Sequence, residues 1–152
     1  MKRIIITVVI SLIIFGGSGY WIGYSTGNSA IKPVSYAEVV NFVKNNKVYD
    51  KLDSNEAFDS ASTIKENANK KGIKCAFVIL TIGSKFWAID AFETTDKGVV
   101  YLDSQGTCFL EGIRVGGNEL VSVIPAEITQ GKEVRMNFSF GKNNINRIDY
   151  IW

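Results

Sequence analysis

Side chains that could serve as nucleophiles or acid–base groups are few in this chain of 152 residues. It contains two cysteines, Cys75 and Cys108, and no histidine. Histidine is the usual general base near neutral pH, and it links the nucleophile to the acid in serine and cysteine catalytic triads. Two thiols without histidine or a closely spaced cysteine pair also form a poor ligand set for a metal. The composition therefore excludes triad catalysis and predicts no metal site and no other cofactor.

The two cysteines, Cys75 and Cys108, allow two structural interpretations. A disulfide is chemically permitted if the domain lies outside the cytoplasm. Alternatively, both are free thiols that pack as small apolar side chains. The choice depends on whether the two Cα atoms come within bonding range, which spacing along the chain does not show. Both alternatives stay open at this level.

Carboxylates and hydroxyls offer no evident replacement for a triad. Asp103 could pair with Asp59 or Asp90, but carboxylates in a sheet protein lie more often at the surface or in turns. Ser60 and Ser62 have no evident base beside them. We therefore expect a protein that is not an enzyme.

The elements that position these side chains follow an apolar N-terminal segment. Residues 4–24 carry no charge and come directly after Lys2 and Arg3. The segment is long enough to span a hydrocarbon core of about 30 Å, and aromatic residues gather at its outer end. Residues 1–27 are therefore predicted to be a single-pass anchor in the cell membrane, with an uncleaved or cleaved signal peptide as the alternative. The positive-inside rule places the N-terminus in the cytoplasm and the remaining domain outside it.

Three glycines follow a helical spacing at the end of this segment. Gly19, Gly23 and Gly27 lie four residues apart, which would let two membrane helices approach closely. The alternative is a glycine-rich hinge that leads into a linker at residues 28–34. The glycines therefore predict either a helix-packing surface or a flexible connection.

Residues 35–152 are predicted to form one small extracytoplasmic domain. Without Lys2 and Arg3 the basic residues number 17 − 2 = 15, which equals the 15 acidic residues. Charges of both signs are interspersed, so no surface for nucleic acid is expected. The predicted partners are the membrane, through residues 4–24, and another protein.

Two predicted helices precede a run of predicted strands. Ser35 and Glu38 form a capping-box pattern that begins the first helix. A second helix is expected from Ser54 to Lys71, followed by Gly72 as its C-terminal cap. From Ile73 the apolar period changes, and the strand candidates are residues 73–82, 86–92, 99–102, 107–115, 120–124, 133–140 and 145–152, with a turn expected from Thr94 to Gly98. This order predicts an α+β domain with helices packed on one side of a mainly antiparallel sheet.

One stretch resembles a known family. From Ala88 to Gln105 the sequence reads Ala-Ile-Asp-Ala-Phe-Glu-Thr-Thr-Asp-Lys-Gly-Val-Val-Tyr-Leu-Asp-Ser-Gln. This resembles the transglutaminase-like superfamily, the papain-related cysteine enzymes, and in particular a membrane-anchored or secreted prokaryotic branch. The resemblance runs from about Ser54 to Gln105 and implies a transglutaminase-like domain over residues 35–152.

The resemblance also implies positions for a Cys/His/acid triad. They fall on Ala57, Trp87 and Asp103, so only the acid is retained. Trp87 is expected either to fill the space of the lost imidazole and pack over Ala57, or to form an aromatic platform for a peptide, glycan or protein. The implied protein is a pseudoenzyme that acts as a non-catalytic binding or scaffolding module. The alternative is a structural subunit of a membrane or cell-surface assembly, held through its transmembrane helix.

Overall fold

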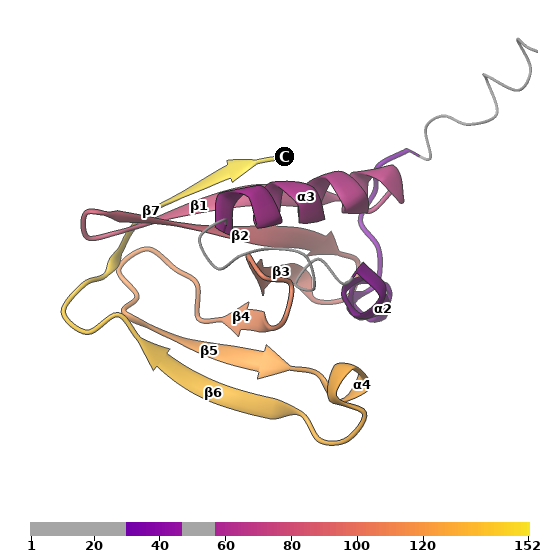
Figure 1. Cartoon of the computed structure of the whole chain (residues 1–152). Coiled ribbons are helices and arrows are strands. Elements are labelled where there is room, and N and C mark those ends of the chain that lie inside the picture. Colours follow the sequence, from indigo (N-terminus) through magenta and orange to yellow (C-terminus); the bar gives the residue numbers. More distant parts are fainter. Residues whose placement is uncertain (1–29, 47–56) are drawn as a thin grey trace, which may run out of the picture.

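A computed structural model describes residues 30–46 and 57–152 (Figure 1). The predicted membrane segment, residues 4–24, and the glycines Gly19, Gly23 and Gly27 lie outside the described residues. Among the residues that are described, no helix combines the length and the apolar character needed to cross a membrane. The structure therefore concerns the predicted extracytoplasmic domain.

The described domain has an α+β fold, as expected. Its helices are α2 (Tyr36–Asn46), α3 (Ala57–Lys70) and the short α4 (Ala126–Thr129). Its strands are β1 (Cys75–Ile82), β2 (Lys85–Thr94), β3 (Gly98–Asp103), β4 (Phe109–Glu111), β5 (Glu119–Ile124), β6 (Val134–Ser139) and β7 (Ile145–Ile151).

Local signals explain how the two longer helices begin and end. The Ser35 N–H donates to the Glu38 carboxylate (2.8 Å), and the Glu38 N–H donates back to Ser35 Oγ (3.3 Å), which confirms the capping box. Gly72 follows α3 with a φ of 74°, the left-handed conformation expected of a C-terminal cap. Lys32 and Val34, from the predicted linker, form parallel bridges to Ile73 and Thr94.

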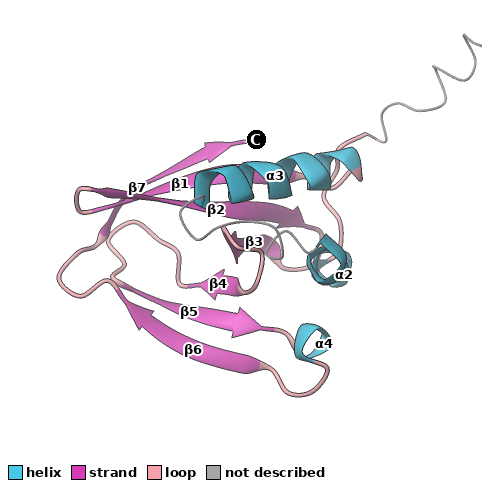
Figure 2. Cartoon of the chain, in the orientation of Figure 1, coloured by secondary structure: helices cyan, strands magenta, loops and turns pink. Residues whose placement is uncertain are grey.

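The seven strands form one sheet in the order β6-β5-β4-β3-β2-β1-β7, and every neighbouring pair is antiparallel. Strands β1 to β6 follow one another as a meander, while β7 returns to pair with β1 at the other end of the sheet. Figure 2 shows α3 lying along β1 and β2, with β5 and β6 curving away below them. The helices are therefore distributed over one face, as the order of elements predicted.

The two faces of the sheet carry separate apolar clusters. On the face that α3 covers, Cys75 lies opposite Phe92, and both belong to a cluster with the helical residues Ile64 and Ala68. On the other face lies a second cluster, which has no helical member among the described residues. Its buried residues are Ala76, Val78, Leu80, Ile89, Ala91, Leu110, Leu120 and Ile145.

The sheet curls around this second cluster. The Gly116 N–H donates to the Ile145 carbonyl and the Ile145 N–H donates to the Gly117 carbonyl, each at 2.8 Å. These bonds join the β4–β5 loop to the start of β7. The Trp87 ring on β2 contacts the Phe138 ring on β6, with ring centroids 6.0 Å apart. Strands at distant places in the sheet order are therefore brought together on this face.

Candidate functional site

The three positions implied for a triad do not lie on one face. Successive residues of a strand point to opposite faces. Phe77 faces α3, because its ring packs against Phe58 with centroids 5.9 Å apart, and Asp90 is its direct cross-strand partner. Trp87 is three residues from Asp90 and therefore points to the opposite face, where it packs against the second cluster. The expectation that Trp87 packs over Ala57, the first residue of α3, is thus wrong.

Asp103 stabilises the connection between β3 and β4. Its carboxylate accepts hydrogen bonds from the Thr107 N–H (2.6 Å), the Thr107 hydroxyl (2.8 Å) and the Cys108 N–H (2.9 Å). A carboxylate that binds backbone and hydroxyl donors of its own turn fixes the conformation of that turn. The residue implied to orient a catalytic imidazole therefore has a structural role in this chain.

The stretch that resembles the transglutaminase-like superfamily, Ala88 to Gln105, also has a structural role at the turn between β2 and β3. The Lys97 N–H donates to Thr94 Oγ1 (3.0 Å), and the Thr94 hydroxyl donates to the Gly98 carbonyl (2.7 Å), which closes the predicted turn. The Asp96 carboxylate accepts the Tyr36 N–H (2.8 Å), and Lys97 Nζ lies 3.6 Å from the centroid of the Tyr36 ring. These residues connect the β2–β3 turn to the start of α2.

Both cysteines are free thiols, so of the two alternatives that the sequence left open, the structure contains the free thiols and not a Cys75–Cys108 disulfide. Burial beneath α3 raises the pKa of the Cys75 thiol well above its usual range, and the neighbouring Asp90 raises it further. Burial also raises the pKa of the Cys108 thiol, with a further contribution from Asp103. Because the thiolate is the nucleophile, neither side chain is activated for attack at neutral pH.

Asp90 is a buried acid that sequence reasoning placed at the surface or in a turn. It is completely buried on the α3 side of β2. Its Oδ1 atom lies 3.7 Å from Cys75 Sγ, which donates to it, and its Oδ2 atom has no hydrogen-bond partner among the described residues. Burial raises the pKa of Asp90 well above its ordinary value, Asp103 raises it further, and the contact with Cys75 partly opposes this. Alternation with the apolar Ala88 and Phe92 was the signal that could have predicted its burial.

The region around Trp87 is a hollow lined by aromatic rings. Trp87 packs edge-on against Phe140 with centroids 5.5 Å apart, and Phe138 packs against Phe140 at the same distance. The cavity has a volume of about 420 Å³. Its lining includes Ile82, Lys85, Phe86, Trp87, Phe138 and Phe140. A hollow of this size suits a side chain or a small ligand, since ligand sites range from about 300 to 1,000 Å³.

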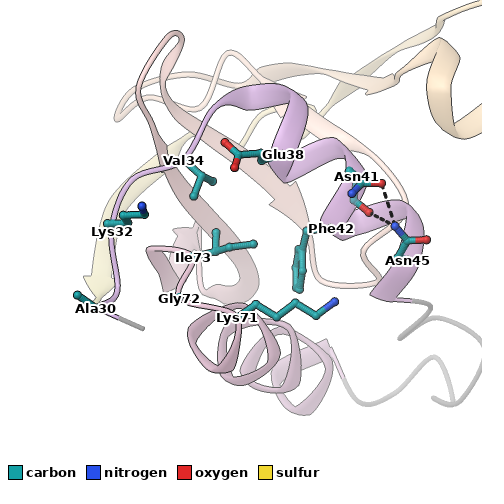
Figure 3. A pocket seen from close by; sticks show the side chains of 10 residues that line it. All are labelled: Ala30, Lys32, Val34, Glu38, Asn41, Phe42, Asn45, Lys71, Gly72 and Ile73. Atoms are coloured by element: carbon teal, nitrogen blue, oxygen red, sulfur yellow. Dashed lines mark hydrogen bonds between the residues drawn. The ribbon is translucent and has the colours of Figure 1, made fainter. Parts of the chain in front are cut away.

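A second cavity, of about 570 Å³, lies between α2, the end of α3 and the segment that precedes α2 (Figure 3). Figure 3 shows that polar side chains on its rim bind within the protein: Asn45 donates to the Asn41 carbonyl and side-chain oxygen at 2.8 and 2.9 Å. The Glu38 carboxylate binds Ser35, and Lys71 Nζ lies over the Phe42 ring at 5.3 Å. This cavity is larger than the hollow at Trp87, but it has less exposed aromatic surface to offer a ligand.

Among residues 30–46 and 57–152, no group of three or more acidic, cysteine or histidine side chains is placed to hold a metal ion. The described site is therefore an aromatic hollow with a buried thiol–carboxyl pair on the other face of the sheet. Comparison with known proteins finds no family model, no curated protein and no solved structure that matches this chain. The likeness to the transglutaminase-like superfamily accordingly rests on the motif residues themselves.

Proposed function

We propose that this chain is a non-catalytic binding module that holds an apolar segment of another protein at the hollow around Trp87. In this proposal residues 4–24 anchor the chain in the cell membrane, with the N-terminus in the cytoplasm and the domain outside. The domain is a pseudoenzyme of transglutaminase-like ancestry. The observation that carries the proposal is the cluster of Trp87, Phe138 and Phe140, whose rings line a cavity and are partly open to solvent.

Aromatic rings in this arrangement favour binding over simple core packing. Phe138 is 50% exposed and Phe86, on the rim, is 65% exposed. Covering apolar surface is favourable by about 25 cal/mol per Å², and rigid aromatic side chains lose little conformational entropy when they bind. A partner that inserts an apolar side chain between Trp87 and Phe138 would cover surface that now contacts water.

The chemistry of the polar residues supports a non-catalytic role. The pKa values of both thiols are raised, Asp103 is bound within its own turn, and the sequence has no histidine. An activated thiol needs a nearby base or positive charge to favour the thiolate. The arrangement therefore favours recognition over catalysis. The alternative, a structural subunit held through residues 4–24, concerns residues outside the described part.

A peptide selection tests the proposal. Full-length protein in lipid nanodiscs is presented to a random peptide library, and peptides that bind are retested on Trp87→Ala and Phe138→Ala. We expect the selected peptides to contain an aromatic or large aliphatic residue and to bind both variants at least about ten-fold more weakly, the loss that follows from removing a central aromatic contact.

Trp152→Ala is the matched control, because it removes an equally large ring that stacks on Tyr150 instead of lining the hollow. It should leave peptide binding unchanged. Equal binding of the selected peptides to wild type and Trp87→Ala, in variants that circular dichroism shows to be folded, would contradict the proposal.

A further inference from the structure

Strand β6 has an unpaired edge and an exposed apolar row. Among the described strands it lies at the end of the sheet and pairs only with β5, in unbroken register from Val134 to Ser139. Val134, Met136 and Phe138 point to one face and are 40%, 52% and 50% exposed. The strand contains no proline that would block further pairing. Edges of this kind add another strand unless charges, bulges or covering segments prevent it.

The opposite edge of the sheet is protected in a way that β6 is not. Both edges carry charged side chains, since Arg147 forms an ion pair with Asp149 at 2.6 Å on β7 and Arg135 forms ion pairs on β6. On β7, Lys65 of α3 also donates from Nζ to the Ile151 carbonyl at 2.7 Å, which covers one of the backbone acceptors of that strand. Covered backbone groups are among the usual protections against edge-to-edge pairing. The two edges therefore differ in their readiness to accept a strand.

We propose that the free edge of β6 pairs antiparallel with β6 of a second copy of this chain, with Met136 on the two-fold axis. In this register Val134 of each copy lies opposite Phe138 of the other, and the two Met136 side chains lie side by side. All the apolar residues of the exposed row therefore meet apolar partners, and cross-strand pairs of this kind stabilise antiparallel pairing. A symmetric dimer requires a self-complementary surface of this kind.

The charges on the other face of β6 agree with this register. Arg135 lies opposite Asn137 of the second copy, so no like charges meet. Arg135 also forms ion pairs with Glu111 and Glu133 of its own chain, the latter at 2.9 Å, which balances its charge locally. A shift that centres the pairing on Arg135 would place two arginines directly opposite each other, which is destabilising. A shift by one residue would place the apolar residues of one copy (Val134, Met136 and Phe138) opposite the polar residues of the other (Arg135 and Asn137).

The dimer does not rest on the proposed binding function, although Phe138 belongs to both surfaces, because Met136 does not line the hollow and Trp87 is not part of β6. The two can therefore fail separately. Peptide binding is measured at Trp87, whereas pairing of two copies is measured at Met136.

Disulfide trapping tests the register. Full-length Met136→Cys in detergent micelles or vesicles should form a covalent dimer under mild oxidation, because the two introduced thiols would face each other across the axis. Wild type, with Cys75 and Cys108 in place, and Asn137→Cys should stay monomeric on the same gel. Failure of Met136→Cys to crosslink, or a crosslink at Asn137 in its place, would overturn the proposal.

Sedimentation of the full chain tests the affinity. Met136→Asp should weaken dimerisation roughly ten-fold or more, because two carboxylates would meet on the axis in place of an apolar pair. Val115→Asp is the matched control, since Val115 is 61% exposed on the β4–β5 loop, and it should leave the dimer intact. A wild-type chain that stays monomeric at high concentration would overturn the proposal. So would loss of the Met136→Cys crosslink in Gly23→Leu, because dimerisation would then depend on the N-terminal segment.

Discussion

Replacing Asp90 by asparagine should change the way in which the free energy of unfolding depends on pH. Asp90 is fully buried beneath α3, and within the part of the chain that the structure describes its Oδ2 atom is unpartnered and its Oδ1 atom accepts a hydrogen bond from the Cys75 thiol. Burial raises its pKa well above the ordinary value of 3.8. The carboxyl group is therefore protonated in the folded protein at pH values where it is ionised in the unfolded chain.

The size of the effect follows from proton linkage. Below pH 3.8 both states hold the proton, and the contribution of Asp90 to stability is fully present. As the pH rises from there through the folded-state pKa, unfolding releases a proton, and the free energy of unfolding falls by about 1.4 kcal/mol per pH unit. Asparagine has no proton to release in this window. It leaves a buried amide donor unpaired at a cost of about 1–3 kcal/mol, but this cost does not vary with pH.

Urea unfolding followed by tryptophan fluorescence measures this difference. The full-length wild type and Asp90→Asn are compared in the same detergent from acid to neutral pH. As the pH rises, the free energy of unfolding should fall for the wild type relative to the variant. Asp59→Asn, which changes an exposed carboxylate, is the control and should follow the wild-type profile. Parallel profiles for wild type and Asp90→Asn would show that Asp90 is ionised in the folded protein and would refute the reasoning.

Three further predictions follow from the same structure. Asp103→Ala should lower the free energy of unfolding by roughly 2–4 kcal/mol in a denaturant titration, because three hydrogen bonds to a charged group are lost; no change would mean that the turn holds without them. The double variant Ala57→Cys with Trp87→His should show no fast iodoacetamide labelling at neutral pH, because α3 and Trp87 lie on opposite faces of the sheet; rapid labelling would contradict that placement. Cys75 should stay unmodified by a thiol reagent until urea unfolds the protein, as read by mass spectrometry, and labelling of the native state would show that it is accessible.

Local patterns accounted for much of the fold. The capping box at Ser35 and Glu38, the glycine after the second helix and the turn from Thr94 to Gly98 were all predicted from neighbouring residues, and the structure contains each of them. The change from helical to alternating apolar period near Ile73 likewise predicted an α+β domain. These features depend on backbone conformations and hydrogen bonds that a few adjacent residues control.

Other expectations failed where distant residues decide the outcome. The strand expected at residues 107–115 is only Phe109–Glu111, because the following loop bonds to the start of β7. The helix α4 was not predicted, since its four residues carry little periodic signal. Asp90 was placed at the surface because aspartate is rarely buried, yet strand alternation and the position of α3 enclose it.

The sequence by itself determined that the chain lacks histidine, that residues 4–24 carry no charge, and that its described part combines helices with an antiparallel sheet. Only the tertiary structure decided that Trp87 and α3 lie on opposite faces, that Phe138 joins Trp87, and that β6 is the last of the described strands at its end of the sheet. The physical reason is that composition and local propensity belong to the chain. The face and the partner of a strand depend on pairing between segments far apart in sequence, and a shift of one residue in that pairing would move each side chain to the other face.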